Sequence, residues 1–392
     1  MTKTHSVRLD ASASEMAQEE ILKQVSYVSR DVRGARFREG GTVLEFDTPT
    51  GSSADLLPNI EALVTRIQRG LRSLKRQVVH RTPRADEPSF RGPGSLDGVH
   101  LLGPGFVALE GLPLRLFRYF DRAFEDFGRP WKAEPLLTPT LIDASVLAKC
   151  DYFRSFPNSV TFAAHLPEDV AVIDGFRRRH QDRDALDENV TRDLAGPPEA
   201  CLSPAVCYHA YRLHAGRTVP AGGLVYGVCG KCFRYETSNM KDLRRLWDFT
   251  MREVVFLGSR DGVLDHRQRA SEMMGRFLDE HELAAEIRTA SDPFFIAPDA
   301  VSKTYFQLSS ETKFEVSLLL PGGERLATGS LNYHTDFFGR AFDVSVEGAG
   351  AMHSVCVAFG LERWVYAFLA QHGDEPSAWP SIVRDTLARP PS

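Results

Sequence analysis

Residues 222–258 decide the fold, and they read GGLVYGVCGKCFRYETSNMKDLRRLWDFTMREVVFLG. β-Branched and aromatic residues concentrate in Leu224–Tyr226 and Phe249–Phe256, whereas polar and charged residues fill the stretch between them. This pattern predicts two strands that are joined by a long charged loop. Arg234 and Glu236, separated by one residue, stand where the first strand ends.

Glu253 occupies an apolar face of the predicted return strand. Successive side chains of a strand alternate between its two faces, so Glu253 shares a face with Phe249, Met251, Val255 and Leu257. A buried carboxylate costs on the order of several kcal/mol unless a cation, a metal or a set of donors compensates it. The sequence therefore predicts a compensating group beside Glu253.

Length and composition are ordinary for a globular protein. The 392 residues can form one large domain and a smaller one, with 43% hydrophobic and 25% charged residues. No apolar run reaches the roughly 18 residues of a membrane span, and no apolar signal core is present, so we predict a soluble cytoplasmic protein without a membrane partner. The net charge of −5 argues against a surface dominated by nucleic-acid binding.

The six cysteines do not form the pattern of a disulfide framework in a chain of this size. Packed thiols or metal ligation are the better interpretations. The cysteines are residues 150, 201, 207, 229, 232 and 356.

The patterns divide the chain into a small α/β domain at 1–84, a linker at 85–98 and a large domain at 99–392. In the small domain we expect a strand at Ser6–Asp10, a helix at Glu15–Ser29, a hairpin at Gly34–Asp47 and a helix at Ala54–Arg76. In the large domain we expect a charged helical insertion near 164–200 and strands at Lys313–Leu320 and Gly329–Val344.

One face of the helix at Ala54–Arg76 is basic. Such a face is either solvated or a docking patch for RNA or an acidic protein, and both interpretations stay open. Its residues are Arg66, Arg69, Arg72, Lys75 and Arg76.

Three segments in order resemble the motifs of class II aminoacyl-tRNA synthetases. The helix Pro113–Phe127 and the strand Leu136–Ile142, with Pro139, resemble motif 1; Phe-Arg-Tyr-Glu at 233–236 resembles motif 2; and FGLER within Val355–Gln371 resembles motif 3, with Ala358 where the family more often has glycine. The resemblance implies an α+β fold, an antiparallel sheet flanked by helices, and a homodimer formed through motif 1.

The resemblance also implies a site for ATP. Arg234 would hold the α-phosphate, Arg363 would stack on adenine or hold the γ-phosphate, and Glu236 would contact adenine. The guanidinium group suits this role because it stays charged and presents a planar fork to phosphate oxygens. Mg²⁺ would bind the phosphates, with Glu315 or Asp336 as its acidic ligand.

Cys207, Glu253 and Cys356 resemble the zinc site of atypical archaeal seryl-tRNA synthetases and of their truncated relatives, the amino acid:[carrier protein] ligases. In these enzymes Zn²⁺ binds the α-amino group of the substrate. Inert packing is the alternative for each cysteine. Cys229 and Cys232 form a CxxC without a second ligand pair, so we interpret them as packed thiols.

The strings YFRSFP, SPAVCYH, MREVVF, NYHTDFFG and FGLER resemble the carrier-protein ligases more than full synthetases. The leading hypothesis is ATP-dependent activation of a small amino acid, followed by its transfer to the phosphopantetheine thiol of an acidic carrier protein. The alternatives are a seryl- or threonyl-type tRNA synthetase, although tRNA is not the favoured partner, and a non-catalytic paralogue. His334 and His353 are interpreted as hydrogen-bonding residues rather than ligands.

Overall fold

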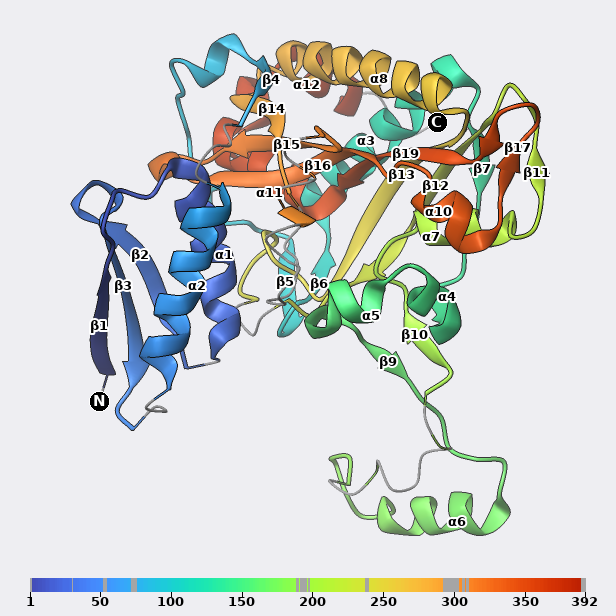
Figure 1. The fold of residues 1–392 in the computed structure, drawn as a ribbon, viewed down its shortest axis with the longest axis horizontal. Helices are drawn as coiled ribbons and strands as arrows, with labels where there is room; N and C mark the ends of the chain where they lie inside the picture. Colours follow the sequence, from blue (N-terminus) through green and yellow to red (C-terminus); the bar gives the residue numbers. More distant parts are fainter. Residues whose placement is uncertain are drawn as a thin grey trace.

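The computed structural model describes residues 2–388 except 30, 52–54, 72–75, 188–189, 191–195, 197, 237–239, 292–302, 305–306 and 308–309. An eight-stranded sheet forms its centre (Figure 1). All neighbouring strands are antiparallel except β7, which pairs in parallel with β12. The strands in spatial order are β4 (Val78–Arg81), β14 (Ala285–Thr289), β15 (Lys313–Leu319), β16 (Arg325–Tyr333), β19 (His353–Gly360), β13 (Asp248–Gly258), β12 (Leu224–Phe233) and β7 (Glu134–Leu136).

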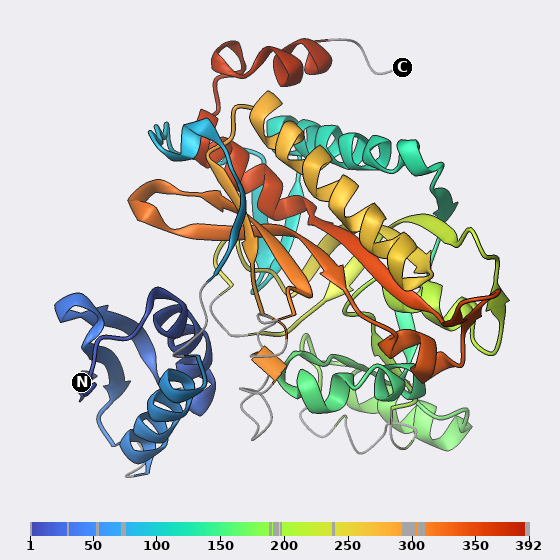
Figure 2. The same cartoon turned by 45° about the horizontal axis from the view of Figure 1, so that its top comes forward.

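Helices cover both faces of this sheet, so inner strands such as β13, β14 and β19 bury both of their side-chain rows, whereas the outermost strands β4 and β7 stay largely exposed. One face packs on three long helices (Figure 2). Aromatic residues such as Phe124 and Trp364 fill the core between the helices and the sheet. The other face packs on short helices and holds Cys207, Val255 and Cys356. The long helices are α3 (Gly111–Phe127), α8 (Arg260–Glu280) and α11 (Leu361–His372), followed by α12 (Ser381–Leu387); the short ones are α4 (Ala144–Lys149), α5 (Tyr152–Ser155), α7 (Cys207–Leu213) and α10 (Phe337–Phe342).

The hairpin predicted at residues 222–258 is confirmed as β12 and β13. Its register pairs Leu224 with Leu257 and Val228 with Glu253, and β13 pairs on its other side with β19. Glu253 lies on the face that carries Met251, Val255 and Leu257, as expected, and all four are buried. The hairpin therefore forms the middle of the sheet.

A smaller unit precedes the large sheet. Two helices pack on one side of a three-stranded sheet of order β1-β3-β2, with Phe46 and Ile60 fully buried between the layers. The division of the chain at residues 84 and 98 stays a prediction. The elements are β1 (Thr2–Arg8), α1 (Glu15–Val28), β2 (Arg33–Arg38), β3 (Val43–Pro49) and α2 (Leu56–Leu71).

The expected basic face of the second helix is reduced in the structure. Arg69 is exposed and Arg66 is half-buried, but Arg76 follows the helix and forms an ion pair with Glu19 of α1. Arg72 and Lys75 lie outside the described residues. The patch interpretation thus loses Arg76, because this guanidinium group is directed into the protein rather than to solvent.

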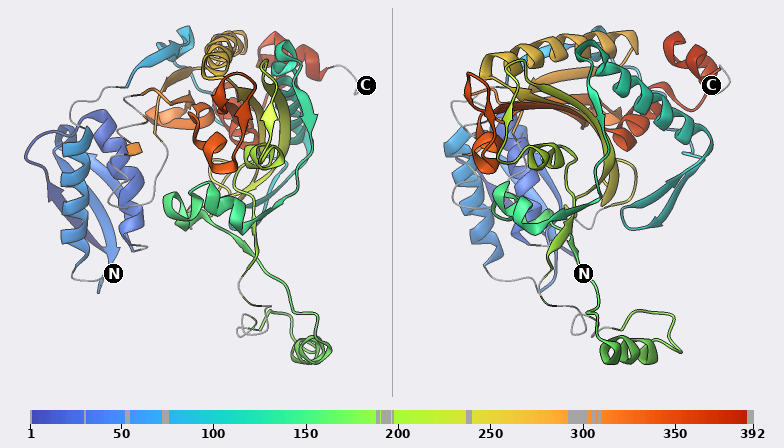
Figure 3. Two further views of the ribbon diagram at one scale, coloured as in Figure 1. Left: turned by 45° about the vertical axis from the view of Figure 1, so that its right-hand side comes forward. Right: turned by 90° about the vertical axis from the view of Figure 1, so that its right-hand side faces the viewer.

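The charged insertion contains one described helix, α6 (Val170–Arg179). It follows β9 (Phe162–Ala163) and precedes β10 (Ala200–Leu202), which pair with each other and extend away from the sheet. Two views place α6 at the end of this extension, apart from the body of the molecule (Figures 1 and 3). The insertion therefore offers a surface that the core does not cover.

Two predicted strands are wrong in extent. The strand expected at Leu136–Ile142 is split into β7 and β8 (Leu141–Asp143), which belong to different sheets. Pro139 lies in the break and has no N–H for a ladder bond. The strand expected at Gly329–Val344 ends at Tyr333, and Phe337–Phe342 forms α10, whose Phe338 packs on Tyr211.

The remaining described strands are short. They are β5 (Val99–Gly103) and β6 (Phe106–Leu109), which form a hairpin, and β11 (Thr218–Val219), β17 (Ser345–Val346) and β18 (Gly350–Ala351), which form a small sheet. Among the described residues, no helix combines the length and apolar character that a membrane crossing requires.

Candidate functional site

The three residues predicted as metal ligands come together in the interior. Cys207 begins α7, Glu253 lies in the middle of β13, and Cys356 lies on the neighbouring strand β19. Glu253 faces Ala358 and Val255 faces Cys356, so the carboxylate and the Cys356 thiol occupy diagonal positions on one face. One ligand atom from each of the three residues lies within 4.8 Å of the others.

Burial makes this cluster electrostatically demanding. Glu253 is only 1% exposed, and its Oε2 has no hydrogen-bond partner. Burial, together with the neighbouring Cys356, raises the pKa of Glu253 well above its usual range. A bound cation would remove this penalty.

The two thiols differ in their proton affinity. The hydrogen bond with Cys207 lowers the pKa of Cys356 well below its usual value, and His334 and Asn332 act in the same direction. The same hydrogen bond, with burial, raises the pKa of Cys207. The cluster thus already favours a thiolate at Cys356, the form in which cysteine binds metal ions.

A second set of residues surrounds the Cys356 sulfur. Asn332 Nδ2 lies 3.6 Å from Sγ, and His334 Nε2 lies 3.7 Å from it. The other ring nitrogen of His334 lies 3.1 Å from Ser354 Oγ and 3.3 Å from Tyr211 OH. His334 is therefore a hydrogen-bonding residue, as expected, but the sequence did not predict that it contacts the cluster. Asn332 was missed because its role depends on its register opposite Cys356.

The donor set fits a zinc ion. Two sulfur atoms and one carboxylate oxygen are typical protein ligands of Zn²⁺, and three protein ligands with one open position are typical of catalytic zinc. The unpartnered Glu253 Oε2 and the thiolate-favouring surroundings of Cys356 both match a cation at this point. The assignment of the metal stays a prediction.

Cys229 and Cys232 do not form a second metal site. They are three residues apart on β12, so their side chains point to opposite faces of the sheet. Cys229 Sγ contacts Asp121 Oδ1 at 3.4 Å, whereas Cys232 is buried in the core that contains Cys207. Among the described residues, only Cys207, Glu253 and Cys356 form a group of three potential ligands.

Arg234 follows directly from β12, on the face that carries Glu253. Its Nε donates to the backbone oxygen of Pro204 at 2.8 Å, and its guanidinium group lies 5.6 Å from the centre of the Phe249 ring. Burial opposes its charge, but Tyr152, Cys232 and Glu236 outweigh this effect and raise the pKa of Arg234. A permanent cation thus stands beside the cluster.

Arg363 lies in the first turn of α11, directly after β19. Its Nε donates to the Arg244 oxygen at 2.8 Å and its Nη1 to the Ala327 oxygen at 3.0 Å, which fix the guanidinium plane. Burial lowers the pKa of Arg363, and the charges of Glu236 and Glu315 oppose this shift. The structure therefore places Arg234, Glu236, Glu315 and Arg363 in one electrostatic neighbourhood.

Register places Glu315 on the same sheet face as the cluster. Residues directly opposite each other on neighbouring strands point to the same face, and Glu315 of β15 pairs with Ser330, Ser330 with Ala358, and Ala358 with Glu253. The small side chains of Ser330 and Ala358 separate the two carboxylates. Asp336, the alternative magnesium ligand, instead pairs with Arg340 on α10 at 2.6 Å.

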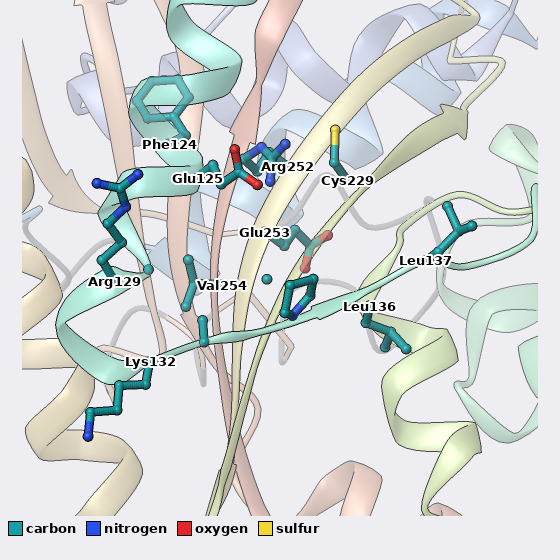
Figure 4. Close-up of a pocket in the computed structure, with 14 residues that line it drawn as sticks. Phe124, Glu125, Arg129, Lys132, Leu136, Leu137, Cys229, Arg252, Glu253 and Val254 are labelled. Atoms are coloured by element: carbon teal, nitrogen blue, oxygen red, sulfur yellow. The ribbon is translucent and has the colours of Figure 1, made fainter.

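A cavity of about 400 Å³ lies on the opposite side of the hairpin (Figure 4). Its walls come from the end of α3, the following Arg129 and Lys132, β7, and the residues of β12 and β13 that alternate with Glu253, including Arg252 and Val254. Glu253 also lines this cavity, which therefore adjoins the cluster and borders the elements that resemble motif 1. His353 also lies outside the cluster, since its Nδ1 is 2.7 Å from Tyr333 OH.

Comparison with curated proteins identifies the family. The chain is 34% identical over 268 residues to amino acid–[acyl-carrier-protein] ligase 1 of Bradyrhizobium diazoefficiens, an alignment that covers 66% of this chain and 77% of that protein. The chain belongs to the amino acid–[acyl-carrier-protein] ligase family. Ligase 2 of the same organism is 35% identical to this ligase over 260 residues, covering 65% of this chain and 74% of the relative. A search of family models found none that matches this ligase.

More distant relatives share the fold. The type-2 serine–tRNA ligase of Methanopyrus kandleri is 27% identical over 280 residues, and the alignment covers 68% of this ligase but 53% of that enzyme. A crystal structure of M. kandleri seryl-tRNA synthetase with tRNASec superposes with a TM-score of 0.68 at 20% identity, covering 98% of this ligase and 77% of that chain. Seryl-tRNA synthetase from Pyrococcus horikoshii with ATP gives 0.58, at 13% identity, with 86% and 80% coverage. The predicted α+β fold of the class II synthetases is thus confirmed.

Proposed function

We propose that this ligase activates a small amino acid with ATP as an aminoacyl-adenylate and transfers it to the phosphopantetheine thiol of a carrier protein. The observation that carries the proposal is the match to two amino acid–[acyl-carrier-protein] ligases over most of their length. The convergence of Arg234, Glu253 and Glu315 on one face of the central sheet supports it independently.

The adenylation half-reaction is assigned to the half-buried Arg234 and Arg363. Attack of the substrate carboxylate on the α-phosphate of ATP increases negative charge at phosphorus, and fixed positive charge there lowers the barrier. Arg234 would meet the α-phosphate and Arg363 the purine or γ-phosphate, while Glu236 would contact adenine. Glu315, whose Oε1 accepts from Ser317 Oγ at 2.9 Å, is the preferred acidic ligand for Mg²⁺ because it lies on the sheet face that carries the cluster. Asp336 pairs with Arg340 on α10.

Cys207, Glu253 and Cys356 would hold Zn²⁺. When bound, this ion supplies a coordination position for the α-amino group, which selects amino acids over hydroxy acids because nitrogen is the better ligand. The surrounding Asn332 and His334 would orient the Cys356 thiolate through their contacts at 3.6 and 3.7 Å.

As the docking surface for the carrier protein, we favour the insertion that contains α6 over the basic face of α2. α6 exposes Arg177 and Arg178, and its exposed Val170 and Ile173 add apolar surface, a combination that suits an acidic protein partner. Arg177 and Arg178 both pair with Asp174 but stay exposed, whereas Arg76 beside α2 is paired with Glu19 and only 10% exposed, so the α2 face offers less.

We assign the homodimer contact to α3 and the segment after β7. Leu137 is 92% exposed and Leu141 is also exposed, although both are large apolar residues beside the cavity and β8. A second copy of the chain would cover them. Leu137→Glu should therefore convert the dimer to a monomer in sedimentation experiments, whereas a monomeric wild-type protein would contradict this assignment.

Transfer to tRNA is the alternative function, favoured by the match to the type-2 serine–tRNA ligase of M. kandleri. A transfer assay separates the two. The ligase is supplied with ATP and the activated amino acid, and with either a phosphopantetheinylated carrier or total tRNA. We expect a hydroxylamine-sensitive thioester on the carrier and none when the carrier lacks phosphopantetheine; charged tRNA with an unmodified carrier would reverse the assignment.

A further inference from the structure

The N-terminal unit contacts the large sheet through the helix α1. Glu15 and Glu19 stand one helical turn apart on the side that faces Arg325 of β16 and Arg288 of β14, near the end of the sheet where β4 is the outermost strand. Figures 1 and 3 show the N-terminal unit beside this end of the sheet. Glu15 pairs with Arg325 at 2.9 Å. These contacts join two parts of the chain that are separated by more than two hundred residues.

Glu19 is the centre of this contact. One of its oxygens lies 2.7 Å from Arg76 Nη1, and the other lies 3.2 Å from Arg288 Nη2; Arg325 Nη1 follows at 4.0 Å. A single carboxylate from α1 thus approaches three guanidinium groups, two of which, those of Arg288 and Arg325, belong to strands of the large sheet.

Arg76 and Arg288 depend on this carboxylate. Their side chains are 10% and 7% exposed, and the Nε of each is buried without a hydrogen-bond partner. Burial lowers the pKa of Arg76, the charge of Glu19 opposes this shift, and the neighbouring Arg288 adds to it. Two buried like charges require a counterion, because the attraction to it must offset their desolvation.

Glu315 is the carboxylate on β15 that neighbours Arg288 of β14. It lies directly opposite Arg288 in the β14–β15 pair, and its charge also acts on Arg76. On its other side it faces Ser330 and acts on Arg363 of the nucleotide site. Glu315 therefore stands between the arginines that Glu19 neutralises and the arginine assigned to ATP.

We propose that the N-terminal unit sets the affinity for magnesium–ATP through Glu19. Glu19 is a positioning residue: it neutralises Arg76 and Arg288 and so weakens their electrostatic attraction to Glu315. The inference rests on the proposed function, since it takes Glu315 as the magnesium ligand. Without Glu19, the guanidinium groups of Arg76 and Arg288 form ion pairs with Glu315 and compete with Mg²⁺ for its carboxylate oxygens. ATP binding then requires more Mg²⁺.

The test is calorimetric titration of ATP into the full chain, without amino acid, at several Mg²⁺ concentrations. Glu19→Gln keeps the shape of the side chain and removes its charge. For Glu19→Gln we expect the dissociation constant of ATP at low Mg²⁺ to rise about fivefold, which is near the lower end of the coupling usually found between two sites. The difference from the wild type should shrink as the Mg²⁺ concentration increases. Glu15→Gln is the matched control, because Glu15 is 68% exposed and pairs with Arg325 rather than Arg76 or Arg288; its magnesium dependence should equal that of the wild type.

The double variant Glu19→Gln/Arg288→Met separates positioning from stability. It removes the one of the two competing cations that lies directly opposite Glu315, so its magnesium dependence should return toward that of the wild type even if its melting temperature falls further. Equal magnesium dependence in Glu19→Gln and wild type, or no recovery in the double variant, would overturn the inference. If wild type binds no ATP and catalyses no amino-acid-dependent pyrophosphate exchange, the proposed function fails instead.

Discussion

Cys356 of β19 lies diagonally across from Glu253 of β13, so that a thiol and a carboxylate from neighbouring central strands meet inside the protein. Glu253 Oε2 has no hydrogen-bond partner there, and Cys207 closes the group from the opposing helix. A folded protein rarely leaves a buried carboxylate oxygen unpartnered. The relationship between these two residues is the basis for the proposed metal centre.

Replacement of Cys356 by serine tests that centre. Cys356→Ser removes a soft ligand, so we expect the loss of bound zinc and of adenylation together, measured by elemental analysis and by pyrophosphate exchange. Cys229→Ser is the matched control, since Cys229 lies on the opposite face beside Asp121 and should leave zinc content unchanged. Full activity of Cys356→Ser without zinc would refute the site.

His334 should affect metal affinity without being a ligand. His334→Gln disturbs the contact with Cys356 and the link to Ser354, and outer-shell changes of this kind lower metal affinity by about 10- to 100-fold. Competition with a chelator measures the shift. His353→Gln, which alters the residue paired with Tyr333, should show none; equal effects of the two variants would point to a general loss of stability.

Arg234 should be intolerant even of lysine. Arg234→Lys retains the charge but loses the planar fork and the bond to the Pro204 oxygen, so the rate of exchange should fall by about 10²- to 10³-fold. Arg69→Lys on the exposed side of α2 serves as the control. An unchanged rate in Arg234→Lys would exclude this residue from transition-state stabilisation.

Two buried histidines predict acid sensitivity. Burial lowers the pKa of His281 and of His372 to about 4, although the hydrogen bond from His281 Nδ1 to the Phe277 oxygen acts in the opposite direction. The Nε2 of His281 lies 2.7 Å from Tyr119 OH. Between about pH 6.5 and pH 4 the unfolded chain binds protons that the folded chain does not, so stability falls as pH falls through this window. From the shift, the contribution of each histidine is at most about 3 kcal/mol.

Denaturant unfolding between pH 7 and pH 4.5 measures this effect. His281→Asn can still donate to the Phe277 oxygen but does not titrate, so the free energy of unfolding should depend less on pH than in the wild type. A pH dependence identical to that of the wild type would contradict the assignment of His281.

Local pattern predicted the elements that carry long periodic signals. The hairpin around Glu253, the strand and helix around Arg363, and the helix at Gly111–Phe127 all form near their predicted bounds. The strands predicted at Leu136–Ile142 and Gly329–Val344 were wrong in extent. Pro139 has no N–H for a ladder bond, and at Phe337–Phe342 tertiary packing, as between Phe338 and Tyr211, overrides the local preference for strand.

The site could be predicted only through resemblance. Cys207, Glu253 and Cys356 are far apart in the chain. The register of β13 and β19 brings Glu253 and Cys356 together, and the packing of α7 on this sheet face adds Cys207. Asn332 and Glu19 carry no sequence signal of their own. The contact of Asn332 arises from the pairing of β16 with β19, and the contacts of Glu19 arise from the packing of α1 beside Arg288 of β14.

Amino-acid-dependent ATP–pyrophosphate exchange with all twenty amino acids, with zinc determined on the same sample, tests the central claim most directly. We predict exchange with one small amino acid and about one zinc ion per chain, the number that a single three-ligand site would hold. No exchange with any amino acid in a folded, zinc-loaded protein would contradict the claim that this ligase activates an ordinary amino acid.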